Sequence, residues 1–447
     1  MGAGVVGAAI ARELARLELR VTLLEAGPDV GAGTSKANTA LLHTGFDAKP
    51  GTLEARLVAR GCDLLREYAP RVGIPLEQPG ALLVAWDEGQ RADFAGIVQR
   101  AQANGCDSIG ELDAGELYRR EPNLGAGAHG ALEVPDEGLL CPFTTPLAFV
   151  TEAVLAGCEL RTRTGLIGVE RLAGGGFGLE TTGGRLTTGL LVNAAGLRSD
   201  EVDRLLGRSG FTITPRRGEL IVFDKLASPL VDHIVLAVPT KVSKGVLVSP
   251  TVFGNVMVGP TADDVERKDN TASTEAGLVY LRKEAGRILP ALLGHEVTAV
   301  YVGLRAATEH GDYQIAFEDG YAGVGGIRST GLSASMAIAE HVREGLGLAE
   351  LEPRAGLPEP RMANIGQRCA RPFARAELIQ SDADYGRIVC FCERVTRGEI
   401  RDAFAGPVPP VDLDGLRRRT RAHLGRCQGF FCGAQLEALV AEATRDG

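Results

Sequence analysis

Long apolar runs, long basic runs and a disulfide framework are all missing from this sequence. No apolar stretch approaches the ~18 residues that a membrane-spanning helix needs, and no signal peptide is visible. Lys and Arg (48) are outnumbered by Asp and Glu (57), and the net charge of −9 disfavours nucleic acid as a partner. Four of the nine cysteines lie close together near the C-terminus, which suits a reducing cytoplasm and a metal centre better than disulfides.

What the chain does have is a glycine turn at its very start. Gly2, Gly4 and Gly7 are followed, 18 residues after the last of them, by Glu25. In a dinucleotide-binding βαβ unit, such glycines allow a tight turn, close approach of a pyrophosphate and close helix packing, while the acid accepts hydrogen bonds from a ribose. The phosphates would lie at the start of the helix predicted over 5–17, where unpaired N–H groups favour anions. The spacing therefore predicts dinucleotide binding.

This turn should follow a β-strand, but only Met1 precedes it. The strand is normally central, parallel and buried, so its loss would cost about as much as a domain's whole stability of roughly 5–15 kcal/mol. We therefore expect a gene start assigned several codons late, which also leaves room for a short leader. An intact mass of the natural protein matching residues 1–447 would refute this expectation.

Further strings along the chain resemble one known family. They are Thr34-Ser35-Lys36-Ala37-Asn38, His43 to Gly51, Asn193 to Gly196, Pro215 to Glu219, Gly303-Leu304-Arg305 and Gly326 to Leu332. Together they resemble the D-amino-acid-oxidase-like FAD oxidoreductases. Within that family the chain is similar to the L-2-hydroxyglutarate oxidase branch and to the large subunit of anaerobic glycerol-3-phosphate dehydrogenase. The motifs are specific for the superfamily and much less so for the substrate.

The resemblance implies an α/β fold with three parts. These are a Rossmann-like FAD-binding domain whose first strand is missing, an interleaved α+β substrate domain, and a small helical [2Fe–2S] domain. The expected FAD-binding segments are 1–75, 136–214 and 300–350, and the substrate segments are 76–135 and 215–299. Residues 351–384 are expected to form a linker, and residues 385–447 the iron–sulfur domain.

The resemblance also implies which residues contact FAD besides the glycine turn and Glu25. Ser35, Lys36 and Asn38 are expected along the cofactor, and Ala195 and Gly196 are expected to approach it by their backbone. Gly331, Leu332 and Ser333 are expected to border the isoalloxazine ring. They open the helix predicted over 332–346, whose first N–H groups would stabilise negative charge on the reduced ring.

The C-terminal cysteines form two close pairs. Cys390 and Cys392 are followed, after 34 intervening residues, by Cys427 and Cys432. Four thiolates that converge in this way suit a [2Fe–2S] cluster or zinc, with unpaired thiols as a third alternative. Zinc more often uses C-x2-C pairs, whereas this spacing resembles the bacterioferritin-associated-ferredoxin-like (BFD-like) [2Fe–2S] domain.

Oxidation of an alcohol carbon needs a hydride acceptor, a base and a cation that holds the substrate's charge. His43 is the first candidate base, because it lies on the flavin-side loop and the ordinary imidazole pKa of ~6.5 suits the task. His310 is the second. Arg305 and Arg328 flank turns expected to face the flavin, and Arg217 lies in the substrate domain; each could hold a carboxylate or phosphate. A structural histidine and a surface salt bridge remain the alternatives for these residues.

We therefore predict an FAD-dependent dehydrogenase for a small anionic alcohol, with a [2Fe–2S] cluster that passes electrons to an acceptor protein or a quinone-linked membrane subunit. Glycerol 3-phosphate, oxidised to dihydroxyacetone phosphate, is the leading substrate. L-2-hydroxyglutarate or another 2-hydroxy acid comes next, then an amine. The hypothesis from another class is a non-catalytic electron-transfer subunit of a multi-subunit flavoprotein. The expected location is cytoplasmic, with contact to the inner face of the membrane through a partner.

Overall fold

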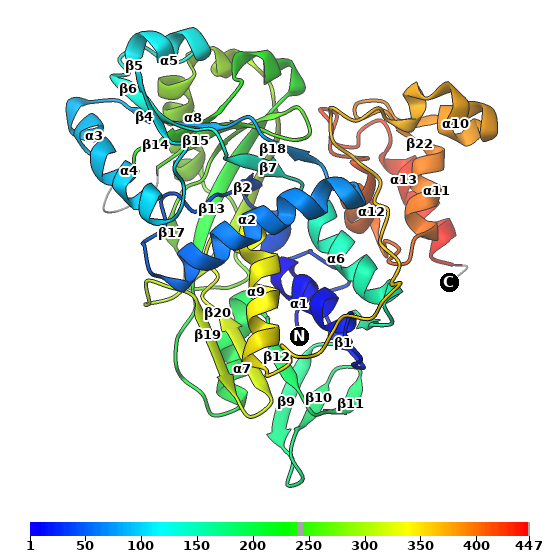
Figure 1. Cartoon of the computed structure of the whole chain (residues 1–447). Coiled ribbons are helices and arrows are strands. Elements are labelled where there is room, and N and C mark those ends of the chain that lie inside the picture. The colour runs from blue at the N-terminus through cyan, green and yellow to red at the C-terminus, as the bar shows by residue number, and fades with distance from the viewer. Residues whose placement is uncertain (240–244, 446–447) are drawn as a thin grey trace.

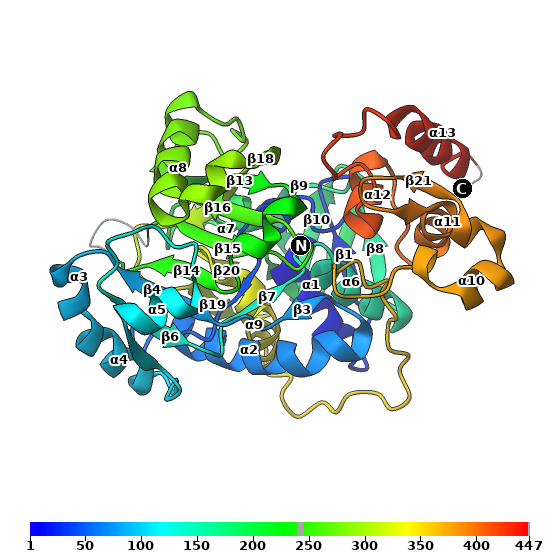
Figure 2. The same cartoon turned by 90° about the horizontal axis from the view of Figure 1, so that it is seen from above.

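Three regions are visible in the computed structural model, which describes residues 1–239 and 245–445 (Figure 1). A sheet-rich region lies at the top left, a region of packed helices lies at the centre, and the C-terminal helices lie at the right. Seen from above, the sheet-rich region lies at the left and the C-terminal helices lie at the right (Figure 2). We refer to these as the substrate region, the flavin region and the cluster domain.

The flavin region is built from helices packed between short strands. Its helices are α1 (Val5–Ala15), α2 (Leu53–Val72), α6 (Thr144–Leu155), α7 (Ser199–Leu205) and α9 (Gly331–Gly345). Its strands are β1 (Thr22–Leu24), β2 (Leu41–Leu42), β3 (Leu76–Glu77), β7 (Gly138–Leu140), β8 (Glu159–Arg161), β9 (Leu166–Arg171), β10 (Phe177–Thr181), β11 (Gly184–Thr188), β12 (Leu191–Asn193), β19 (Gln314–Glu318) and β20 (Tyr321–Gly325). Helix α1 is buried along most of its length and packs on α9 and α6.

Glycines permit the closest helix crossing in this region. A Cβ atom on Gly61 of α2 would lie 2.2 Å from the backbone oxygen of Ser333 in α9. A side chain at this position would therefore force the two helices apart. The start of α9 is held in a fixed place over α2 and α1.

The parallel strands of the flavin region form two separate ladders. β1 pairs with β8, and β12 pairs with β20, which in turn pairs with β19. Met1 and Gly2 bridge the two ladders. The Met1 amino group donates to Val192 O at 2.7 Å, Ala194 N donates to Met1 O at 2.9 Å, and Gly2 N donates to Leu24 O at 2.8 Å. These two residues therefore lie where the sequence analysis places the first strand of the βαβ unit.

The substrate region is a nine-stranded mixed sheet covered by helices. The sheet order is β17-β13-β16-β15-β14-β4-β6-β5, with β18 also paired to β13. Its strands are β4 (Ala81–Ala85), β5 (Gly110–Asp113), β6 (Gly130–Val134), β13 (Thr214–Phe223), β14 (Ile234–Ala237), β15 (Leu247–Pro250), β16 (Val256–Gly259), β17 (Asp263–Asp264) and β18 (Val297–Ala307). Its helices are α3 (Glu88–Ala92), α4 (Phe94–Ala103), α5 (Ala114–Arg120) and α8 (Glu275–Ile288).

The cluster domain follows a long irregular segment. Residues 351–371 contain no helix or strand, and backbone hydrogen bonds hold them to the flavin and substrate regions at Arg16, Val72 and Val252. The domain itself contains α10 (Ala376–Ser381), β21 (Ile388–Cys390), β22 (Val395–Thr396), α11 (Arg397–Ala405), α12 (Leu413–Thr420) and α13 (Gly433–Ala443). It has a small apolar core of its own, which includes Val395, Leu416 and Leu436.

The predicted fold class is confirmed: a mixed α/β chain ends in a small helical domain. The predicted domain boundaries stay a prediction. Within the described residues, no helix is both long enough and apolar enough to cross a bilayer.

Candidate active site

The glycine turn and Glu25 come together as the spacing predicts. Glu25 follows β1, and its two carboxylate oxygens accept hydrogen bonds from Ala3 N and Gly27 N, each at 2.7 Å. A Cβ atom on Gly7 would lie 1.8 Å from Gly2 O, so only glycine fits beneath this turn. Gly4, the residue before α1, has no side chain that could cap the first N–H groups of the helix. The arrangement fits a pyrophosphate at the helix start and a ribose at the acid.

The loop after β1 carries the next predicted FAD residues. Ser35 Oγ accepts from Val5 N at 2.8 Å, which places this hydroxyl at the start of α1. Asn38 holds the loop in shape, because its side chain donates to Ser35 O and accepts from Ala40 N, both at 2.8 Å. Lys36 Nζ lies 3.0 Å from an Asp414 carboxylate oxygen in α12 of the cluster domain. Lys36 thus links the flavin-side loop to the cluster domain.

Two backbone segments predicted at the cofactor are open to it. Gly196, which follows β12, has a φ of 56°, and a Cβ atom there would meet nothing within 4 Å. At the start of α9, the residue before Gly331 provides no side-chain cap. The N–H groups of Gly331, Leu332 and Ser333 therefore form an uncapped helix end, which suits an anionic ring edge. The predicted neighbour Ala195 lies beside Gly196.

His43 lies directly after β2 and is held from two sides. Its backbone N–H donates to Ser333 Oγ at 2.8 Å. Its ring Nδ1 lies 3.0 Å from Glu137 Oε2, off the line of an ideal hydrogen bond. Glu137 is 0% exposed, and its other oxygen accepts from the Thr44 backbone N–H at 2.7 Å and the Thr44 hydroxyl at 2.8 Å. An imidazole fixed at Nδ1 in this way can exchange a proton at Nε2.

Arg305 lies on the face of β18 that meets the flavin-side loop. Side chains alternate along a strand, so Tyr301, Gly303 and Arg305 share one face. Tyr301 donates to Asn38 O at 2.7 Å, and a Cβ atom on Gly303 would lie 1.9 Å from Ala37 O. The Arg305 guanidinium donates to the backbone oxygen of Thr261.

The charge of Arg305 is poorly compensated. Burial, with repulsion from Arg216, lowers the pKa of Arg305 to about 10. The two nearest acids, Asp263 and Asp264, form their ion pairs with Arg217 and Arg216 instead. A half-buried cation without a carboxylate partner in the described residues suits an anionic ligand.

The structure does not gather the other predicted catalytic residues around His43 and Arg305. Arg217 occupies the β13 position next to Arg216, which is paired in register with Arg305, so Arg217 projects to the opposite face of the sheet. Arg328 pairs with Glu54 at 2.6 Å and donates to Gly311 O at 2.9 Å. His310 is 42% exposed, and its Nε2 lies 3.0 Å from Gly210 O. We carry His43 and Arg305 forward.

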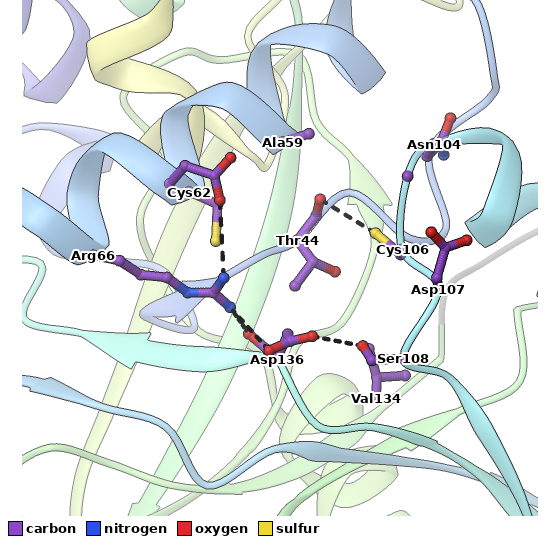
Figure 3. A pocket seen from close by; sticks show the side chains of 12 residues that line it. Thr44, Ala59, Cys62, Arg66, Asn104, Cys106, Asp107, Ser108, Val134 and Asp136 are labelled. Carbon is purple, nitrogen blue, oxygen red and sulfur yellow. Dashed lines mark hydrogen bonds and ion pairs between the residues drawn. The ribbon is translucent and has the colours of Figure 1, made fainter.

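A cavity of about 320 Å³ lies behind this site (Figure 3). Thr44, the residue that binds Glu137, forms part of its wall, opposite Arg66 and Asp136. Arg66 is near Asp63 and Asp136, so its charge is already matched by acids. Burial raises the pKa of the Cys62 thiol, also in this wall, to about 12. Neither an unmatched cation nor a reactive thiol from these residues is available to a ligand in the cavity.

The four C-terminal cysteines gather in two pairs. The thiols of Cys392 and Cys427 share a hydrogen bond, as do those of Cys390 and Cys432. Hydrogen bonds from the backbone N–H groups of Phe431, Gly429 and Phe430 lower the pKa of Cys427. Within the described residues, no three Cys, His, Asp or Glu side chains meet as a single metal ion would require. Two thiol pairs suit a binuclear cluster, in which each iron takes two cysteines.

Glu137 was not found by sequence reasoning. It lies in a Pro-Asp-Glu-Gly turn, which is typical of an exposed loop. The signal was in the strand register, because Leu42 pairs with Gly138 and the next position along brings His43 to Glu137. That register is not readable from one sequence.

Comparisons with known proteins identify the families of both parts of the chain. Residues 1–344 match the FAD dependent oxidoreductase (DAO) family, and residues 388–442 match the BFD-like [2Fe-2S] binding domain. The chain is 33% identical to glycerol 3-phosphate dehydrogenase of Caloramator mitchellensis, over 99% of this chain and 93% of that protein. It is 28% identical to mitochondrial L-2-hydroxyglutarate dehydrogenase of Caenorhabditis elegans, over 59% of this chain and 62% of that protein.

A solved structure gives the same answer for the fold. Dithionite-reduced L-alpha-glycerophosphate oxidase from Mycoplasma pneumoniae, with FAD bound, superposes with a TM-score of 0.76 at 27% identity. The match covers 80% of this chain and 96% of that one. The cofactors of the chain are FAD and a [2Fe–2S] cluster, and the electron-transfer domain calls for a redox partner. The chain belongs to the DAO family of FAD-dependent oxidoreductases and carries a C-terminal BFD-like [2Fe–2S]-binding domain.

Proposed function

We propose that this chain is a dehydrogenase that oxidises glycerol 3-phosphate to dihydroxyacetone phosphate. The observation that carries the proposal is the half-buried Arg305 guanidinium on the sheet face that meets the flavin-side loop. A phosphate dianion would supply the negative charge that this cation lacks among the described residues. The glycerol 3-phosphate dehydrogenase of C. mitchellensis supports the choice of substrate, because its similarity includes the cluster domain.

The two retained residues divide the chemistry between them. FAD, when bound, supplies the acceptor for the hydride that leaves the alcohol carbon. His43 takes the hydroxyl proton at Nε2, because Nδ1 faces Glu137. Arg305 holds the phosphate and thereby orients the alcohol carbon.

The electrons are proposed to leave through the cluster. Phe391 and Phe430, which lie between the ligand cysteines in sequence, are 58% and 96% exposed, so the ligand loops face solvent. An acceptor protein or a quinone-linked membrane subunit could approach the cluster from this side. We place the protein in the cytoplasm, in contact with the membrane through that partner, because its proposed ligand thiols require a reducing compartment.

A second candidate is L-2-hydroxyglutarate or another 2-hydroxy acid. The similarity to L-2-hydroxyglutarate dehydrogenase of C. elegans favours it. Arg305 could hold a carboxylate as well as a phosphate. The two candidate functions differ in their substrate, and both oxidise an alcohol carbon by the same chemistry.

An anaerobic substrate panel tests the proposal. The full-length protein, loaded with FAD and cluster, is mixed with glycerol 3-phosphate, L-2-hydroxyglutarate or an amino acid, and flavin and cluster absorbance are followed together. We expect glycerol 3-phosphate to bleach the flavin first and the cluster afterwards. Bleaching by L-2-hydroxyglutarate alone would transfer the assignment to the second candidate. No bleaching by any of them would favour a non-catalytic electron-transfer subunit.

Arg305→Ala tests the anion site separately. Loss of a charged hydrogen-bond donor should raise KM for glycerol 3-phosphate by about 10- to 100-fold, while FAD content stays unchanged. Arg217→Ala is the matched control, because Arg217 lies on the opposite sheet face, and it should leave KM near the wild-type value. Loss of FAD from Arg305→Ala would show a role in folding or cofactor binding instead.

A further inference from the structure

Glu137 is a buried carboxylate with an unusual set of partners. It lies in the turn between β6 and β7, with 0% exposure. One oxygen is occupied by the backbone N–H and the hydroxyl of Thr44. The other receives no hydrogen-bond donor from the described residues and faces His43 Nδ1 at 3.0 Å.

A charge buried this deeply needs a counter-charge. Within residues 1–239 and 245–445, His43 is the one basic side chain at ion-pair distance from Glu137. A buried carboxylate that faces only an imidazole gains most when that imidazole carries a proton. The negative charge of Glu137 is therefore best compensated after His43 has accepted a proton, and less well compensated before.

Two different elements fix the direction of the His43 ring. Its backbone is held by Ser333 Oγ at the start of α9, and its Nδ1 faces the β6–β7 turn. Thr44 binds Glu137 through both its N–H and its hydroxyl, so the carboxylate itself cannot rotate away. Nε2 is the ring nitrogen that does not face Glu137.

We propose that Glu137 is a positioning residue for the reaction, a role that rests on the proposed function of His43 as the base. Glu137 selects the tautomer with the proton on Nδ1, so that Nε2 carries the lone pair, and stabilises the imidazolium that forms. In the step that it assists, the alcohol O–H proton passes to Nε2. The C–H hydride leaves to the flavin with both electrons, and the C–O bond becomes C=O. Such carboxylate–histidine pairs raise the basicity of the imidazole and fix its orientation.

Single-turnover reduction of the flavin by glycerol 3-phosphate, followed anaerobically against pH, tests the role. Glu137→Gln keeps the shape of the side chain but removes its charge. We expect the limiting rate of flavin reduction to fall by about tenfold or more, while the substrate concentration for half-maximal rate changes little. The neutral amide no longer favours the imidazolium, so the acid limb of the rate profile should move to lower pH. Asp136→Asn, in the same turn but exposed, is the matched control and should behave like wild type.

A double substitution separates this inference from the proposed function. If Glu137 acts through His43, His43→Gln with Glu137→Gln should be no slower than His43→Gln alone. Unchanged flavin reduction in His43→Gln would remove the proposed base, whatever Glu137 does. A slow His43→Gln beside a wild-type Glu137→Gln, or rate losses that multiply in the double variant, would overturn the role of Glu137.

A measurement on the unsubstituted holoenzyme covers the case in which Glu137→Gln does not fold. The ring nitrogens of ¹⁵N-labelled histidine are observed by NMR, and His43→Gln identifies the His43 signals. We expect the neutral ring to carry its proton on Nδ1. A neutral ring protonated on Nε2 would overturn the inference.

Discussion

The flavin region and the cluster domain are held by opposite kinds of contact. Helix α1 packs on α6 and α9 through apolar side chains such as Ile10, Leu14 and Ile338, all buried in one continuous core. The cluster domain has a separate core, its Val408 packs into the large core, and several ion pairs join it to the rest of the protein. The interdomain pairs are Asp29–Arg418, Asp29–Arg419, Lys36–Asp414, Lys225–Glu393 and Asp224–Arg426.

Asp29 is the centre of that interface. It is 3% exposed and accepts from Arg418 Nη2 at 2.6 Å and from the two terminal nitrogens of Arg419 at 2.7 and 2.9 Å. It lies four residues after Glu25, on the loop that continues into the flavin-side residues. The cluster domain is thus fixed to the same loop that carries the residues predicted to contact FAD.

These different contacts predict how the stability of each region should respond to the loss of a side chain. An apolar core loses stability in proportion to the volume removed, because the remaining side chains relax only in part. A buried ion pair fails abruptly when one partner is removed, because the other charge is left uncompensated. The position of the cluster should therefore depend on a few charged residues, and the flavin region on none of them.

The largest effect is expected from Asp29→Ala. It leaves the buried Arg419 guanidinium without its carboxylate and removes one of the two carboxylates that pair with Arg418, at a cost of about 3–5 kcal/mol to docking of the cluster domain. Flavin reduction by substrate should keep its rate, while electron transfer from flavin to cluster slows and the 351–371 segment becomes sensitive to protease. Stopped-flow absorbance and limited proteolysis measure these two results.

Gly415→Ala is the companion to that variant. A Cβ atom at this position would lie 2.6 Å from Asp29 Oδ2, so the substitution disturbs the same contact without removing a charge. Protease resistance and cluster reduction that match wild type in both variants would contradict the ionic docking.

Ile338→Ala removes an apolar side chain from the core of the flavin region and leaves the ion pairs of the cluster domain intact. Ile338 is 0% exposed, and removing its side chain should cost about 2–5 kcal/mol of stability. The melting temperature and FAD retention should fall. In the protein that remains folded, the ratio of the rate of cluster reduction to the rate of flavin reduction should stay unchanged. Ile338→Val, with a smaller cavity, should cost only about 0.5–1.5 kcal/mol.

Acid should release the cluster domain before it unfolds the apolar core. Burial alone would raise the pKa of Glu393, but Arg421 and Lys225 lower it below the ordinary value of 4.5. A lowered carboxyl pKa contributes stability above pH 4.5, which is lost as the pH falls through the lower value of the folded state. Protease sensitivity of the 351–371 segment should therefore rise below pH 4.5, ahead of flavin release. Simultaneous loss of both would contradict the separation of the two regions.

The sequence predicted the flavin region far better than it predicted the contact between the flavin region and the cluster domain. The glycine turn with Glu25, and the two cysteine pairs, are local patterns, so their spacing alone predicted where they would meet. Asp29 has no such pattern, because its partners Arg418 and Arg419 lie about 390 residues away in the chain. Only the folded chain shows those arginines facing the flavin-side loop.

Pairing between residues that are distant in sequence also explains why the candidate catalytic residues Arg217 and Arg305 do not lie together. Arg217 and Arg305 look equivalent in sequence, since each stands in a motif of the family. Strand alternation places them on opposite faces of the sheet, and that follows from a pairing between residues almost 90 positions apart. Glu137 was missed for the converse reason, because a turn that brings an acid to His43 looks in sequence like any exposed turn.

The smallest effect is expected from an ion pair that is not buried. Arg60 of α2 and Glu340 of α9 pair at 2.9 Å within the flavin region, with side chains 54% and 35% exposed. Solvent screens this pair, so Glu340→Gln should change the free energy of unfolding by less than about 1 kcal/mol and leave FAD content unchanged. Urea denaturation followed by flavin fluorescence measures this. A loss of stability as large as that of Asp29→Ala would mean that an exposed ion pair stabilises the protein as much as a buried ion pair does. A small loss beside a large one would agree with desolvation as the cause, because Glu340→Gln removes a carboxylate from one exposed arginine, whereas Asp29→Ala removes a carboxylate from two buried arginines.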